Sequence, residues 1–185
     1  MNIQQKIHTL AEKYHNETVA TRHHLHANPE LSFHEYETSK FVQQKLGEMG
    51  IPFQNGVAGT GVVGLIKGNN PEKQTVALRA DMDALPILEA NDVPYKSKNE
   101  GVMHACGHDG HTAMLLGAVK YLAETRNFDG TVAVIFQPAE EGGGGGQLMV
   151  EEGMLDRFAI DEVYGMHNQP DLPIGEFRIR PGPFY

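Results

Sequence analysis

Nine consecutive residues concentrate groups that bind metals or transfer protons. Residues 103–111 (MHACGHDGH) hold three histidines, one aspartate and the single cysteine of the chain. Cys106 and His108 are separated only by Gly107, and glycine lets a backbone turn tightly. A thiolate and an imidazole at this spacing, on a loop that leads into a helix, can both reach one ion. For this pair alone, the alternative is a buried free cysteine beside solvated histidines.

Other ionisable residues follow predicted strands directly. They are Asp81 and Asp83 after residues 75–79 (TVALR), Glu140 and Glu141 after residues 131–136 (TVAVIF), and His167 after residues 162–166 (EVYGM). In open α/β sheets, ligands bind beyond the carboxyl ends of the strands. Each residue alone has an ordinary explanation, as a turn aspartate, a solvated acid or a hydrogen-bonded histidine. Their coincidence with the 103–111 loop favours one common site.

The adjacent residues Glu140 and Glu141 are expected to have different roles. Neighbouring side chains on an extended backbone point to opposite sides, so Glu140 and Glu141 are expected to make different contacts. One can bind a metal while the other faces a water molecule as general base. The glycine tract at residues 142–146 is expected to leave room for a substrate, the alternative being a flexible linker.

Four side chains form the candidate ligand set: Cys106, His108, Glu141 and His167. This mixture of sulfur, nitrogen and oxygen donors suits Zn²⁺, Mn²⁺, Co²⁺ or Ni²⁺ better than Ca²⁺ or Mg²⁺. Two four-coordinate ions need about eight ligand positions, more than these side chains and a shared water supply. Either the site holds one ion, or a ligand lies outside this chain.

Hydrophobic periodicity and turn residues predict the elements that position these groups. The expected helices cover residues 3–26, 34–49, 109–125 and 147–154, and the expected strands cover residues 61–67, 75–79, 131–136, 162–166 and 175–180, with 68–73 as a turn. Their alternation predicts a layered α/β fold with a mostly parallel or mixed sheet flanked by helices. His23, His24 and His26 lie one and two residues apart on the first helix, so their side chains are expected to diverge and not to form a metal site.

Composition excludes several partners. The chain has 185 residues, 40% of them hydrophobic, and a formal net charge of −9, which fits one folded domain and disfavours nucleic acid. No apolar run approaches the roughly 20 residues of a membrane span. A polar N-terminal segment and the lack of a second cysteine favour a cytoplasmic location.

Five motifs, in order, resemble a known family. They are RHHLHANPEL (22–31), RADMDALP (79–86), MHACGHDGH (103–111), QPAEEGGGGG (137–146) and GMHN (165–168). The sequence resembles the metallo-amidohydrolases that include aminoacylases, hippurate hydrolases, auxin-conjugate hydrolases and N-acetyl-diaminopimelate deacetylases. The resemblance implies a zinc-exopeptidase-like fold and hydrolysis of small-molecule N-acyl amino acids.

The resemblance also implies roles for single residues. The implied ligands of two divalent metal ions are Cys106, His108, Glu141 and His167. Glu140 is implied as the general base, and Asp83 as a support of Glu140 or of the metal site. The resemblance implies that Asp81 contacts the metal ligands without binding a metal itself, and it leaves the roles of His104 and His111 open. Metals lower the pKa of bound water to about 7, so Glu140 can take its proton and later return it to the leaving nitrogen.

Family members are longer than this chain. They continue into a lid and dimerisation domain, and then complete the catalytic domain with a further metal-binding histidine. We therefore expect residues 1–185 to be an incomplete catalytic domain, with RPGP at residues 180–183 as the passage to the lid, and we expect impaired activity and self-association through exposed apolar surface. One alternative is a catalytically silent metal-binding or interaction fragment. Another is a metallo-exopeptidase, since peptides and N-acyl amino acids present the same amide.

Overall fold

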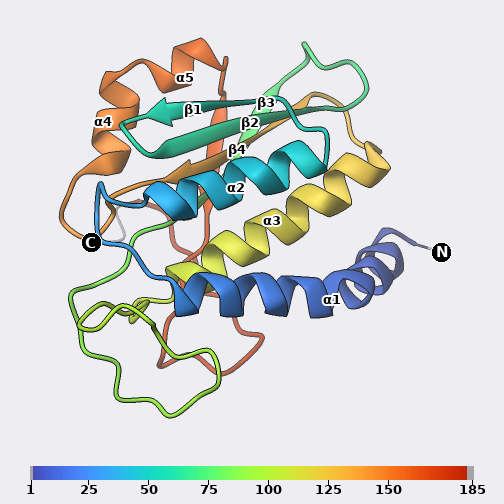
Figure 1. Ribbon diagram of the computed structural model, residues 1–185. Coiled ribbons are helices and arrows are strands. Elements are labelled where there is room, and N and C mark those ends of the chain that lie inside the picture. The colour runs from blue at the N-terminus through green and yellow to red at the C-terminus, as the bar shows by residue number, and fades with distance from the viewer. Residues whose placement is uncertain (1, 183–185) are drawn as a thin grey trace.

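A five-stranded mixed sheet forms the centre of the protein in the computed structural model, which describes residues 2–182 (Figure 1). In sheet order the strands are β1 (Phe53–Val57), β2 (Gly61–Lys67), β4 (Thr131–Gln137), β3 (Thr75–Asp81) and β5 (Glu162–Gly165). β3 runs parallel to β4 and β5, whereas β2 is antiparallel to β1 and β4. The predicted mixed α/β sheet is confirmed. Pro183, in the run expected to lead to a lid, lies outside the described residues.

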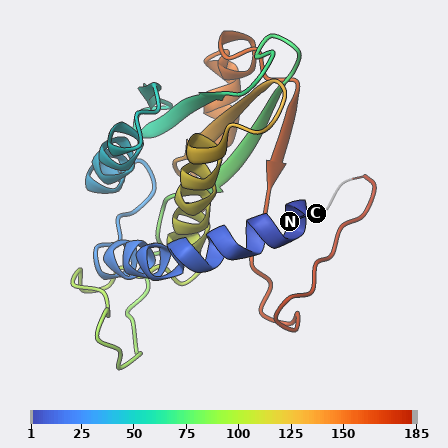
Figure 2. The same ribbon diagram turned by 90° about the vertical axis from the view of Figure 1, so that its right-hand side faces the viewer.

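Helices cover both faces of the sheet (Figures 1 and 2). One layer contains α1 (Ile3–Ala27), α2 (Tyr36–Glu48) and α3 (His108–Thr125), and the other contains α4 (Gly145–Glu151) and α5 (Met154–Arg157). β4 shows why two layers are needed: Phe136 packs into the core with Val119 of α3, and its neighbour Ile135 packs into a second core with Met149 of α4. Burying a side chain of this size stabilises the fold by about 1.5–3 kcal/mol. The expectation that residues 131–136 are covered on both faces is confirmed.

Residues at both ends of α1 determine its length, and close packing against α3 determines its position. Asn2 and Gln5 form a reciprocal capping box at its start, and Asn28 ends it before Pro29. Gly117 of α3 allows close packing, since a Cβ there would lie 3.0 Å from Thr18 Oγ1. Among residues 2–182, no helix has the length and apolar character needed to cross a membrane.

The three histidines near the end of α1 diverge, as expected. His23 stacks on Tyr95, while His24 stacks on Phe41. His26 is buried, with Nδ1 2.9 Å from Asp109 Oδ2. Because Asp109 follows His108 directly, this contact joins α1 to the start of α3, where a candidate ligand lies.

Several sequence-based expectations differ from the structure. The turn expected at residues 68–73 connects β2 to β3, but the two strands are not neighbours in the sheet, because β4 lies between them. The expected helix at residues 147–154 is divided into α4 and α5 at Gly153, which has a φ of 78°. No strand forms at residues 175–180, where Phe177 and Ile179 are 81% and 91% exposed. β1 carries no apolar alternation, since four of its five residues (FQNGV) are exposed, and this explains why the sequence did not indicate it.

The parallel strands bring their carboxyl ends to one edge of the sheet. Asp81 at the end of β3 is in register with Gln137 at the end of β4, and Arg79 is in register with Gly165 at the end of β5. Residues that follow these strands therefore emerge close together. The start of α3 reaches the same edge, because the Thr112 hydroxyl donates to the Asp81 carbonyl at 2.7 Å.

Candidate metal centre

All four predicted ligand side chains come together at this edge. Cys106 Sγ lies 3.4 Å from His167 Nε2, and His108 Nε2 lies 3.8 Å from Glu141 Oε1. Ligand atoms of Cys106, His108 and Glu141 all lie within 4.8 Å of one another, and His108 and His167 belong to a second such group with Asp81 and His111. His108 is common to both groups, so it lies at the centre of the cluster.

Hydrogen bonds aim both candidate imidazoles inward. His108 Nδ1 lies 2.8 Å from the carbonyl oxygen of Asp83, so this nitrogen donates, and the neutral ring carries its lone pair on Nε2. His167 Nδ1 lies 2.7 Å from the Asn168 carbonyl oxygen, which leaves His167 Nε2 facing Cys106. Metal-binding histidines are commonly fixed by a hydrogen bond from the other ring nitrogen in this way.

Two atoms in the cluster indicate what it can bind. His108 Nε2 and Glu141 Oε1 are buried and have no hydrogen-bond partner among the described residues. Leaving a buried polar atom unpaired costs about 1–3 kcal/mol. A cation between His108 Nε2 and Glu141 Oε1 would give each atom the partner that it lacks. The sulfur, nitrogen and oxygen donors of the cluster suit a first-row divalent ion. The residues therefore fit a metal site.

The electrostatics of the cluster also suit a cation. Burial, followed by the nearby carboxylates of Glu141, Glu140 and Asp81, raises the pKa of Cys106 to about 12. Burial lowers the pKa of His108, but the hydrogen bond to Asp83 and the surrounding acids outweigh it and raise the pKa overall. Acidic surroundings thus favour protons on both groups, and a bound metal would replace those protons.

Glu140 and Glu141 both approach His108 Nε2, each with a carboxylate oxygen at 3.8 Å. The expectation that they point to opposite sides assumed an extended backbone and is wrong. Ala139 has a φ of 49°, and the Gly142 N–H bonds to the Glu140 carbonyl at 2.8 Å, so the chain turns here. The Glu140 side chain is 37% exposed and that of Glu141 is 22% exposed, so Glu140 is the more accessible to a substrate.

Asp83 lies behind this turn and holds it. Its Oδ1 accepts the Glu140 N–H and its Oδ2 accepts the Glu141 N–H, both at 3.0 Å, and the Ser32 hydroxyl donates at 2.7 Å. Burial raises the pKa of Asp83, but hydrogen bonds from His108, both amides and Ser32 outweigh it and hold the pKa well below its usual range. The contacts of Asp83 are therefore those of a supporting residue.

Asp81 and His111 form a second support. Asp81 Oδ2 accepts from Arg79 Nη1 at 2.7 Å and Oδ1 lies 2.6 Å from His111 Nδ1. His111 Nε2 accepts the Asn168 N–H at 3.1 Å. Although both residues lie in a group with metal-binding spacing, their side-chain atoms are already paired, so we assign them to fixing the segment that carries His167.

His104 stands apart from both ligand groups. It is buried, and neither ring nitrogen has a hydrogen-bond partner among the described residues. Burial lowers its pKa to about 4. Its nearest ring neighbour given by the structure is His26, at 6.5 Å between centroids. Among residues 2–182, neither group with metal-binding spacing includes His104.

The glycine tract is closely packed at Gly143 and Gly145, whereas Gly142 and Gly144 have nothing within 4 Å of an added Cβ. A Cβ at Gly145 would lie 1.9 Å from the Pro138 carbonyl oxygen, and one at Gly143 would lie 2.6 Å from Ala139 Cβ. The Gly145 N–H also bonds to the Ala139 carbonyl at 3.0 Å. The tract therefore folds back against residues 138 and 139, and Gly143 and Gly145 are needed for this close approach.

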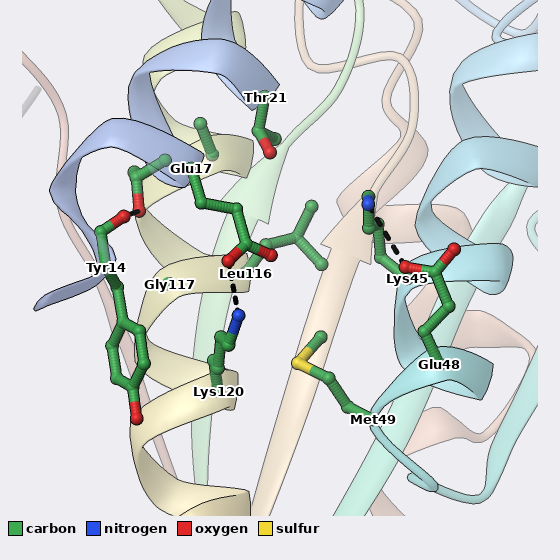
Figure 3. A pocket seen from close by; sticks show the side chains of 11 residues that line it. Tyr14, Glu17, Thr21, Lys45, Glu48, Met49, Leu116, Gly117 and Lys120 are labelled. Carbon is green, nitrogen blue, oxygen red and sulfur yellow. Dashed lines mark hydrogen bonds and ion pairs between the residues drawn. The ribbon is translucent and has the colours of Figure 1, made fainter.

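A separate cavity of about 160 Å³ lies between α1, α2 and α3 (Figure 3). Its charged groups are already paired, Glu17 with Lys120 and Lys45 with Glu48 (Figure 3). None of the candidate ligands lines it. The site at the strand ends is thus distinct from this cavity.

Comparison with known proteins identifies the family. Residues 77–182 match the model of peptidase family M20/M25/M40, so the chain belongs to this family of hydrolases. The chain is 52% identical to a hippurate hydrolase of Campylobacter jejuni over 161 residues, which are 87% of this chain and 42% of that protein. It is 47% identical to an N-acetyl-L-cysteine deacetylase of Bacillus subtilis over 89% of this chain and 39% of that protein.

Solved structures agree. A dinuclear metal-binding peptidase of the M20 family from Bacillus subtilis superposes with a TM-score of 0.81 at 43% identity, over 89% of this chain and 46% of that one. A further relative found by sequence, a thermostable carboxypeptidase of Saccharolobus solfataricus, is 46% identical over 99% of this chain and 47% of its own length. The chain spans less than half the length of each of these relatives. The predicted family is confirmed.

Proposed function

We propose that this chain forms the metal-binding part of an amidohydrolase that cleaves the amide bond of N-acyl amino acids. The observation that carries the proposal is the convergence of Cys106, His108, Glu141 and His167, with two buried donor atoms left unpaired. Relatives that are a hippurate hydrolase and an N-acetyl-L-cysteine deacetylase support this substrate class. Because those relatives are more than twice as long, the proposal concerns the whole protein to which residues 1–185 contribute an incomplete catalytic domain.

We assign those four side chains as the ligands of two divalent ions, drawn from Zn²⁺, Mn²⁺, Co²⁺ and Ni²⁺. The dinuclear site of the Bacillus subtilis structure supports the number of ions. Bound ions would polarise the amide carbonyl and lower the pKa of water to about 7. The buried side of the cluster, at His108, excludes solvent, whereas the exposed His167 side leaves an approach for substrate.

Glu140 is the proposed general base. It is the more exposed of the two glutamates, and its carboxylate stands at the rim of the cluster. There it can take a proton from the attacking water and return it to the leaving nitrogen. Asp83 is a positioning residue in this scheme, because it is buried and fixes the backbone of Glu140 and Glu141.

The test is hydrolysis of acetyl and benzoyl amino acids by the full-length protein, loaded with Mn²⁺ or Zn²⁺. Glu140→Gln keeps the shape of the side chain but cannot accept the proton, so we expect kcat to fall by about 10²–10⁴-fold. Metal content measured on the same samples should be unchanged. Activity that persists in E140Q, or a full-length protein without activity on the whole panel, would overturn the assignment.

A metallo-exopeptidase is the second candidate, favoured by the relative that is a carboxypeptidase. Dipeptides and N-acyl amino acids present the same scissile amide but differ in charge at the amino end. Comparing kcat/KM for the two classes decides between them. Hydrolysis of dipeptides at the higher kcat/KM would replace the first candidate with the second.

We also propose that the 185-residue chain alone is impaired and self-associates. Val163, Tyr164 and Met166 on or beside edge strand β5 are exposed, as are Phe177 and Ile179 further along. Light scattering is expected to report a species larger than a monomer. A fully active monomer would contradict both expectations. An oligomer that binds metal but has no activity would support the alternative of a catalytically silent metal-binding fragment.

A further inference from the structure

Glu35 is a buried carboxylate that the sequence did not single out. It directly precedes α2 and is 0% exposed. Within residues 2–182, no lysine, arginine or histidine forms an ion pair with it. Burying a carboxylate without a cation is costly unless hydrogen bonds satisfy its oxygens, so its partners indicate what it does.

The partners of Glu35 come from three separate loops. Its Oε1 accepts the Phe33 N–H at 3.0 Å and the Ala139 N–H at 2.8 Å, while the Thr60 hydroxyl donates to Oε2 at 2.6 Å. Phe33 and Ala139 are both non-glycine residues with positive φ, 61° and 49°. Such left-handed conformations cost of order 1–3 kcal/mol and persist only where surrounding contacts impose them. Glu35 supplies such a contact to both.

Ala139 is the residue before the proposed base. Three consecutive amides therefore end on buried carboxylates: that of Ala139 on Glu35, and those of Glu140 and Glu141 on Asp83. Asp83 sets the position of the two glutamates, and Glu35 sets the turn that precedes them. Without the left-handed turn, the glutamates would alternate in direction as on a strand and could not both approach His108.

We propose that Glu35 is a positioning residue: by holding Ala139 in its left-handed conformation, it directs the side chains of Glu140 and Glu141 to the metal centre. Its catalytic consequence rests on the function proposed above. Its structural consequence does not, because the turn exists whatever reaction the site performs.

Three substitutions separate positioning from simple burial. Glu35→Ala removes all three bonds, whereas Glu35→Gln can keep both amide bonds through Oε1 and donate to Thr60 through Nε2. Ala139→Gly in the E35A background makes positive φ inexpensive, since glycine adopts it readily. Glu152→Ala is the matched control, because Glu152 accepts the N–H of Ala58 at 2.8 Å, another residue with positive φ (52°), in a turn that bears no candidate ligand.

The first readout is independent of activity. Amide hydrogen exchange of residues 139–141 and Co²⁺ affinity are measured on the 185-residue chain. We expect E35A to lose protection at these amides and to bind Co²⁺ about 10-fold or more weakly, and E35Q to recover most of both. E35A/A139G should recover the Co²⁺ affinity and the protection of the Glu140 and Glu141 amides, which bond to Asp83, but not that of residue 139, whose acceptor is gone. E152A should resemble the parent. Unchanged protection and affinity in E35A, or no recovery with A139G, would overturn the proposal. If E35A does not fold, Glu35→Asp, too short to reach Ala139 in the same way, takes its place.

The second readout is kinetic and uses the full-length protein. E35A is expected to lower kcat by about 10- to 100-fold with little change in KM, as for a misplaced catalytic group, and E35Q to restore most of kcat. Equal kcat in parent and E35A would count against the proposal. A parent without any amidase activity would reject the proposed function instead, and the exchange experiment would then decide the role of Glu35.

Discussion

His108 Nε2 and Glu141 Oε1 lie 3.8 Å apart, both buried and neither with a hydrogen-bond partner in residues 2–182. The residues come from different elements, the first residue of α3 and the loop after β4. A folded protein seldom leaves two such atoms facing each other without a third partner. We interpret the pair, with Cys106 and His167 beside it, as a metal site, and the following predictions test how the surrounding residues maintain it.

Asp83→Asn is expected to destabilise the metal-free chain by about 1–3 kcal/mol, because one carboxylate oxygen becomes an NH₂ group that faces a backbone N–H. Ser32→Ala removes only one of the hydrogen bonds to Asp83, so it should cost about 0.5–1.5 kcal/mol. Urea unfolding gives both values. If D83N proved no more destabilising than S32A, the two amide bonds to Asp83 would not hold the turn.

Gly145→Ala should be strongly destabilising, since the new Cβ would lie 1.9 Å from a backbone carbonyl oxygen. Gly47→Ala is the matched control: Gly47 is exposed in α2 and nothing lies within 4 Å of its added Cβ. An alanine in a helix is favoured over glycine by about 0.5–1 kcal/mol, so G47A should raise the free energy of unfolding. Thermal unfolding of the two variants should therefore shift in opposite directions. A neutral G145A would show that the tract is not packed as described.

His104 is predicted to make stability depend on pH. Its pKa is lowered from 6.5 to about 4 in the folded protein, so between these values the unfolded chain binds more protons. The contribution of His104 to stability is therefore present above pH 6.5 and is lost as the pH falls toward 4. His104→Leu removes this titration and, because neither ring nitrogen has a partner, sacrifices no hydrogen bond in the described structure. The stability of H104L relative to the parent should rise on acidification; parallel curves from pH 8 to pH 4 would contradict this.

His111→Ala tests whether His111 positions a ligand or is one. The substitution removes the bonds to Asp81 and to the Asn168 N–H, so His167 should become less ordered. We expect about 10- to 100-fold weaker metal binding, in the range observed when residues that orient ligands are changed. The stoichiometry should not change. A loss of one bound ion per chain in H111A would show instead that His111 is a ligand.

The sequence predicted the fold well where local pattern and burial agree. Residues 131–136 are apolar throughout because β4 is buried on both faces, and the helix that begins at His108 follows a glycine turn. The order of the strands in the sheet could not be predicted from the sequence, because no local feature of β2 or β3 indicates that β4 lies between them. The mistaken strand at residues 175–180 has the alternation of a strand, but it joins no sheet within residues 2–182.

The sequence likewise predicted some residues of the candidate site and missed others. Residue types that bind metals are visible in a sequence, and those after parallel strands had to emerge at one edge. Glu35 was missed because its partners are backbone amides and one hydroxyl, 2, 25 and 104 residues away along the chain. Glu140 and Glu141 were expected to diverge because the left-handed backbone at Ala139 has no signature in an alanine side chain.

The most direct test of the metal centre is a Co²⁺ titration followed by absorption spectroscopy. The chain has a single cysteine, so a thiolate-to-cobalt charge-transfer band can arise only from Cys106. Our account predicts that this band grows to saturation in the parent chain, weakens in His108→Ala and is absent in Cys106→Ser. Cobalt binding by the parent without the band, or with the same affinity in C106S and H108A, would contradict it.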